Sequence, residues 1–101
     1  RRLDAEEAEA LGIVNKVLDH TELLPYVINL ANEISENGPL AISHIIQSVE
    51  KGVELPIDQG LAIEALLDAI SIASDEQKEG VMAFLEKRKP NFRKILKDIS
   101  R

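Results

Sequence analysis

The 101-residue sequence contains no cysteine and no tryptophan, and its aromatic side chains are two Phe and one Tyr. The lack of cysteine excludes a disulfide framework, thiol chemistry and a cysteine metal site. No apolar run approaches the roughly 20 residues of a membrane-spanning helix, and acidic residues follow Arg1 and Arg2 where a signal peptide would be apolar. We therefore expect a cytoplasmic protein without a membrane partner, whose core consists of Leu, Ile, Val and Ala.

Charge is unevenly distributed along the chain. The net charge is −6, but residues 1–86 carry 5 basic and 17 acidic residues, whereas residues 87–101 carry 7 basic residues and 1 acidic residue. The acidic body argues against nucleic acid as a partner, since nucleic acid needs a broad basic surface. The basic end has two interpretations. Cations near a helix C-terminus complement its dipole, which is the commoner case, or they bind a phosphorylated small molecule.

Hydrophobic periodicity predicts an all-α protein in which residues 1–101 form a single domain of four to five helices. The expected helices cover about residues 5–11, a stretch from His20 or Thr21 to Asn37, residues 39–51, residues 57–73, and a stretch from the N-cap Ser74 to Lys89-Pro90. A short extended segment is expected near residues 13–17, and residues 91–101 can add an amphipathic turn or two.

Two of these helices carry expectations about burial. The buried face of the third helix is expected to comprise Ile42, Ile45, Ile46 and Val49. His44 then falls on the solvated face. The helix over residues 57–73 is apolar on nearly all sides, apart from a narrow polar stripe that includes Glu64 and Asp68. Because so short a chain can barely cover such a helix, we expect segments outside the chain, or other subunits, to cover part of it.

Few residues suggest catalysis. Glu64 and Asp68 are spaced i, i+4 and could split their pKa values for acid–base chemistry, although most such pairs are simply solvated. His20 and His44 match no zinc spacing and are expected to be solvated, while a Ser–His–Asp arrangement stays open. The glycines form no nucleotide-binding motif. We therefore predict no catalytic residue and no metal ligand in this chain.

One basic cluster is a candidate binding site. Lys87, Arg88 and Lys89 lie next to Phe84 and Phe92 in the sequence. A cation beside an aromatic ring suits a ligand that contains a phosphate and a purine.

Three stretches, in this order, resemble the enoyl-CoA hydratase/isomerase (crotonase) family and together span nearly all of residues 2–93. They are residues 2–8 with 11–17, residues 30–41, and residues 75–92, which contain Glu79-Gly80 and the run Ala83-Phe84-Leu85-Glu86-Lys87-Arg88-Lys89-Pro90. The resemblance implies the helical C-terminal (trimerisation or lid) domain of the crotonase fold. The catalytic N-terminal core of β–β–α turns is then absent from this chain.

The resemblance also implies a function. The family acts on acyl-CoA thioesters, and its hydratases use two glutamates and an oxyanion hole, none of which maps onto this chain. It implies that Lys87 and Phe84 contribute to CoA binding, with no cofactor beyond the CoA thioester substrate of the parent enzyme. It further implies homo-oligomers of the parent, as trimers or hexamers. For the fragment, the apolar surface of the helix over residues 57–73 predicts dimers or larger assemblies. Family members often have Phe where Asp68 and Ile72 stand, which indicates a short or polar acyl group, or a site that this helix does not line.

Two alternatives remain open. The chain could be a helical protein-interaction or oligomerisation module without an enzymatic role, or a small stand-alone enzyme that uses Glu64 and Asp68. The sequence begins with Arg1 and its single Met is Met82, so we expect the natural product to be longer or to have been cut.

Overall fold

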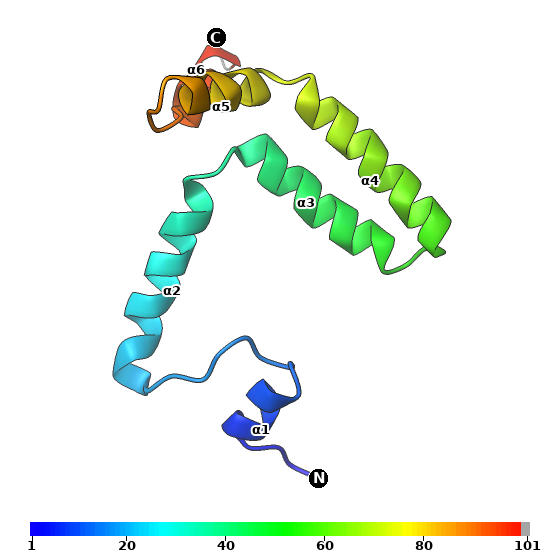
Figure 1. Cartoon of the computed structure of the whole chain (residues 1–101). Coiled ribbons are helices and arrows are strands. Elements are labelled where there is room, and N and C mark those ends of the chain that lie inside the picture. The colour runs from blue at the N-terminus through cyan, green and yellow to red at the C-terminus, as the bar shows by residue number, and fades with distance from the viewer. Residues whose placement is uncertain (100–101) are drawn as a thin grey trace. The chain divides into compact units, whose positions relative to one another are not determined.

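The computed structural model describes residues 1–99, and these residues form helices without any strand (Figure 1). The helices are α1 (Ala5–Ala10), α2 (His20–Ser35), α3 (Pro39–Gly52), α4 (Ile57–Ile72), α5 (Asp75–Leu85) and α6 (Phe92–Ile99). The all-α prediction is confirmed, with a sixth helix where a turn or two was expected; residues 100–101 of that prediction lie outside the described part. Residues 13–17, predicted to be extended, form bends and irregular backbone. No helix in residues 1–99 is long and apolar enough to cross a membrane.

The chain divides into two compact units, Arg1–Ile34 and Ser35–Arg101. In the first unit, α1 begins with a capping box, because Asp4 Oδ1 accepts from the Glu7 backbone N–H at 2.8 Å and Glu7 Oε2 accepts from the Asp4 N–H at 3.2 Å. Gly12, with φ of 72°, follows the end of this helix. Both predicted ends of α1 are therefore confirmed.

The second helix of this unit is held to the preceding loop by a cation–π contact. Lys16 Nζ lies 4.8 Å from the centroid of the Tyr26 ring. Apolar side chains of α2 remain exposed, among them Leu24 at 66% and Ile28 at 52%. This helix therefore has an apolar surface that the other described residues of its own unit do not cover.

In the second unit, α3 and α4 lie side by side as an antiparallel hairpin (Figure 1). Besides the half-buried apolar Leu67 of α4, the residues between them include glycine and polar side chains. A Cβ atom on Gly60 would lie 3.4 Å from Gly52 Cα, and His44 Nδ1 lies 2.6 Å from Ser71 Oγ. At the loop end of the hairpin an added Cβ atom at position 60 would therefore make an ordinary van der Waals contact, and the polar pair of His44 and Ser71 lies nearer the open end.

The predicted buried face of α3 is wrong for three of its four residues, and the fourth, Ile42, is half-buried. Ile45, Ile46 and Val49 are 64%, 52% and 61% exposed, whereas His44, predicted to be solvated, is half-buried. The reason is that α4 packs on the side of α3 that carries His44, so that Ile45 and Val49 only border the groove between the two helices. The apolar surface of α4 is likewise exposed on its outer sides, with Leu66 at 62%.

The N-terminus of α3 is capped by a side chain from α5. Gly38 at the N-cap offers no side-chain acceptor, and the Glu76 carboxylate instead accepts from the backbone N–H groups of Leu40 at 2.8 Å and Ala41 at 3.3 Å. Glu76 is 9% exposed. A Cβ atom on Gly38 would overlap its carboxylate, so this contact requires glycine at position 38.

The fifth helix begins as predicted but ends earlier. Ser74 Oγ accepts from the Gln77 backbone N–H at 3.2 Å, which confirms the N-cap. The helix ends at Leu85, not at Lys89-Pro90, because Lys87 adopts a left-handed backbone conformation with φ of 55°.

Candidate functional site

The turn that ends α5 contains both residues predicted to contact CoA. The Arg88 backbone N–H donates to Ala83 O at 3.0 Å, and the Lys87 N–H donates to Phe84 O at 3.2 Å. These two hydrogen bonds form a Schellman motif with Lys87 at its left-handed position. Lys87 and Phe84 are therefore brought together by the backbone of one turn.

Helix α1 ends in the same motif with glycine at the left-handed position. The Gly12 N–H donates to Glu9 O and the Ile13 N–H donates to Ala8 O, both at 2.9 Å. An L-residue in this conformation costs about 1–2 kcal/mol, whereas glycine adopts it freely. Lysine at position 87 is therefore strained where glycine would not be, and strain of this kind is a reason to look for a function of the side chain.

The side chains at this turn face solvent. Phe84 is 83% exposed, and Lys87 is exposed beside it. An exposed ring and an ammonium group from one turn can meet a purine and a phosphate, respectively. Phe92, also next to the cluster in sequence, is half-buried and lies against Gly80 of α5, so it is not part of the exposed site.

Two of the three cations in the basic cluster are already paired. The ion pairs are Arg88 Nη1 with Glu79 Oε1 at 2.6 Å, Arg88 Nε with Glu86 Oε2 at 2.5 Å, and Lys89 Nζ with Glu36 Oε1 at 3.0 Å. Lys87 makes no ion pair within residues 1–99. Of the cluster, Lys87 is thus the cation whose charge is left for a ligand.

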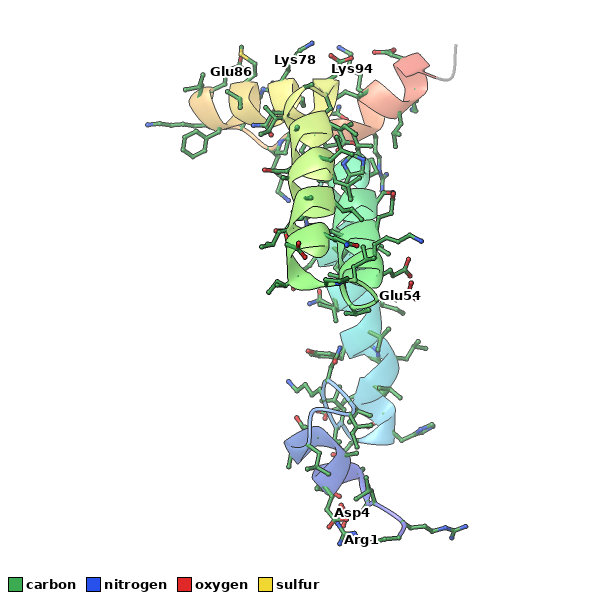
Figure 2. The ribbon with its side chains drawn as sticks, turned by 90° about the vertical axis from the view of Figure 1, so that its right-hand side faces the viewer. Arg1, Asp4, Glu54, Lys78, Glu86 and Lys94 are labelled. Carbon is green, nitrogen blue, oxygen red and sulfur yellow. The ribbon has the colours of Figure 1, made fainter. Side chains whose placement is uncertain are left out.

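Sequence reasoning missed the role of Glu79. Its carboxylate accepts from Arg88 and from the Asn91 backbone N–H, at 2.8 Å for the latter. These bonds, that from Arg88 first, lower the pKa of Glu79 from 4.5 to about 2. A groove of about 680 Å³ beside it is lined also by Lys78 of α5 and Lys94 of α6, whose side chains point the same way in Figure 2. Since Glu79 and Arg88 lie nine residues apart across a helix end, no helical spacing connects them.

The polar residues of α4 line a second groove of about 690 Å³ between α3 and α4. Ser71 and His44 meet there, and Glu64 and Asp68 lie along the same groove. Asp68 makes no hydrogen bond to His44 within the described residues, so a Ser–His–Asp relay is not assembled. The pair formed by Ser71 and His44 joins the two helices.

No group of three or more potential metal ligands occurs in the described part of the chain. His20 is exposed at the start of α2, as predicted. The predicted absence of catalytic and metal-binding residues in this chain stays a prediction.

The helical structure and the sequence both match one family. A family model described as enoyl-CoA hydratase/isomerase matches residues 1–95. The chain belongs to the enoyl-CoA hydratase/isomerase family, which confirms the resemblance at the level of the family.

Individual relatives are similar over nearly the whole chain. It is 42% identical over 90 residues to crotonyl-CoA hydratase of Syntrophomonas wolfei, covering 89% of this chain and 35% of that protein. It is 35% identical over 89 residues to short-chain-enoyl-CoA hydratase of Clostridium acetobutylicum, covering 88% of this chain and 34% of that protein.

Solved structures give the same picture. An enoyl-CoA hydratase from Bacillus anthracis matches with a TM-score of 0.86 and 32% identity, over 91% of this chain and 36% of that one. An enoyl-CoA hydratase subunit from Geobacillus kaustophilus matches with a TM-score of 0.82 and 43% identity, also over 91% of this chain and 36% of that one. The chain thus spans about a third of the length of these relatives.

Proposed function

We propose that this chain is the C-terminal helical part of an enoyl-CoA hydratase/isomerase-like enzyme that acts on acyl-CoA thioesters, for example by hydrating a 2-enoyl-CoA. The observation that carries the proposal is the family match over residues 1–95, together with relatives described as crotonyl-CoA and short-chain-enoyl-CoA hydratases. The catalytic groups belong to the remainder of the parent enzyme. The helices described above contribute to subunit assembly and to part of the CoA site.

The CoA-binding role falls to Lys87 and Phe84. Support comes from the exposed turn that presents both side chains, from the strained backbone of Lys87, and from its lack of an ion pair within residues 1–99. In this role the ammonium group contacts a CoA phosphate and the phenyl ring borders the ligand. Lysine is suited to this task because its flexible stem carries a compact charge.

The assembly role falls to the uncovered apolar sides of α3 and α4. Ile45 and Leu66 are more than half exposed in this chain, and exposed apolar surface of this extent marks an interaction site. We expect the parent to be a trimer or hexamer and the isolated chain to form dimers or larger assemblies. The same surface supports the alternative that the chain is an interaction module without an enzymatic role.

Hydration assays test the proposal directly. The 101-residue chain alone should not hydrate crotonyl-CoA, because it supplies neither the glutamates nor the oxyanion hole. A longer reading frame upstream of Arg1 should encode an active enzyme. Turnover by a clean sample of the short chain would refute the assignment, as would an inactive full-length product.

A charge reversal separates the two roles. Lys87→Glu in the full-length enzyme should weaken CoA binding, measured by calorimetry, while the sedimentation profile stays unchanged. Arg93→Glu, an exposed cation of α6, serves as the matched control for net charge. If Lys87→Glu changes assembly and leaves CoA affinity unaltered, the interaction module is the better description.

A further inference from the structure

Glu79 holds the connection between α5 and α6 in place. Its side chain is 21% exposed, and its two oxygens accept three hydrogen bonds. They come from Arg88 Nη1 at 2.6 Å, Arg88 Nη2 at 3.3 Å and the Asn91 backbone N–H at 2.8 Å. A bidentate arginine–carboxylate pair fixes orientation as well as distance.

The fixed connection continues into the next helix. Asn91 Oδ1 accepts from the Lys94 backbone N–H at 3.3 Å, which caps the start of α6. Glu79 therefore sets the position of the residue that caps α6, and it also anchors Arg88, the residue directly after Lys87. Lys87, with its left-handed backbone, therefore lies between the end of α5 and Arg88, and Arg88 is bound to Glu79 in the middle of α5.

We propose that Glu79 is a positioning residue for CoA binding: by anchoring Arg88 and the Asn91 backbone to α5, it fixes the direction in which Lys87 presents its ammonium group. This inference rests on the proposed CoA contact of Lys87. Glu79 does not touch the ligand, and Arg88 neutralises its charge, so that the carboxylate does not repel the phosphate.

Glu86 provides a matched control because it shares one partner with Glu79 but not the other. It binds Arg88 Nε at 2.5 Å and accepts no hydrogen bond from Asn91. Its side chain is 50% exposed, so its ion pair with Arg88 contributes little. Replacing Glu86 therefore removes one carboxylate beside Arg88, while the hydrogen bond from the Asn91 backbone to Glu79 stays in place.

Limited proteolysis of the 101-residue chain reports on the connection without any ligand. Trypsin cleaves after Lys87 and Arg88, and local opening governs the rate. Glu79→Ala should raise cleavage at these two sites about 3-fold or more relative to cleavage after Lys51 in α3, which reports general unfolding. Glu86→Ala should change this ratio less than 2-fold. Because alanine favours helix, faster cleavage in Glu79→Ala would not come from a weaker helix. Glu79→Gln, which keeps the side-chain shape, should give an intermediate cleavage ratio. An unchanged ratio in Glu79→Ala would overturn the positioning role.

Kinetics of the full-length enzyme with crotonyl-CoA test the link to Lys87. Glu79→Ala and Lys87→Ala should each raise KM about 3- to 5-fold, with kcat unchanged. In the double variant the effects should not multiply, because Glu79 acts through Lys87. Multiplying effects, or a matching loss of kcat, would overturn the inference.

The two failures are distinguishable. If Lys87→Ala leaves KM unchanged while Glu79→Ala still opens the turn to trypsin, the proposed CoA contact is wrong and the positioning role for CoA is overturned with it. If Lys87→Ala raises KM but Glu79→Ala opens nothing, the CoA contact stands and the inference about Glu79 alone is refuted.

Discussion

The left-handed backbone of Lys87 leads to a prediction in which glycine is the stabilising substitution. At φ of 55° an L-residue is disfavoured by about 1–2 kcal/mol, while glycine loses about 0.5–1 kcal/mol more chain entropy on folding than alanine. Lys87→Gly should therefore be more stable than Lys87→Ala by about 0.5–1 kcal/mol. Both variants lack the ammonium group, so their difference isolates the backbone.

Urea unfolding followed by circular dichroism measures this difference. With a slope of about 1–3 kcal/mol per molar, the midpoint of Lys87→Gly should lie roughly 0.2–1 M above that of Lys87→Ala. Glu86, whose φ is −83°, is the matched control. There Glu86→Ala should be more stable than Glu86→Gly, the reverse order. An alanine variant at position 87 that equals or exceeds the glycine variant would refute the argument from strain.

The same pair tests why lysine stands at this position. In the full-length enzyme both variants should bind CoA about 5-fold more weakly than the parent, which corresponds to about 1 kcal/mol for an exposed ion pair. Lys87→Gly would then combine higher stability with weaker binding. Unchanged CoA affinity in both variants would show that the strained lysine does not serve the ligand.

Three further predictions concern other residues. Above pH 4.5, the ordinary pKa of Glu79, its bond to Arg88 should contribute fully to stability, and this contribution should be lost as the pH falls towards 2. Glu79→Gln should remove this part of the acid dependence of the urea midpoint. An identical pH profile in the variant would contradict this expectation. Gly38→Ala should lower the free energy of unfolding by about 1–3 kcal/mol, because the new Cβ displaces a buried carboxylate. Gly52→Ala, with nothing within 4 Å of the added Cβ, should not, and equal losses would refute the reasoning. Leu66→Glu should shift sedimentation of the chain towards monomer, and an unchanged profile would exclude this face of α4 from the contact.

Local sequence signals predicted the helix starts well. Asp4 and Ser74 cap α1 and α5 because an N-cap acts over three residues, a range that sequence spacing captures. Pro39 likewise marks the first turn of α3. The end of α5 was misplaced, because Pro90 is a strong stop signal and nothing in the sequence identifies Lys87 as left-handed.

Burial was predicted less well because it depends on which faces find a partner. The isoleucine side of α3 has the periodicity of a core, yet α4 packs on the side that carries His44. The side chains of α3 that lie on that side, among them His44 and Ser48, are polar or small and leave no periodic apolar signal. The apolar character of α4 on nearly all sides follows from the sequence alone, because most of its residues are apolar.

The sequence by itself determined the helical class, most helix boundaries and the family, because these depend on residues near one another in the chain and on the order of short motifs. Only the tertiary structure decided which cations are paired and which carboxylates anchor which backbone. Glu76 caps a helix that begins 37 residues before it, and Glu79 reaches across a helix end to Asn91. Contacts of this kind arise when the folded chain brings distant backbone N–H groups to a carboxylate, so no local pattern encodes them.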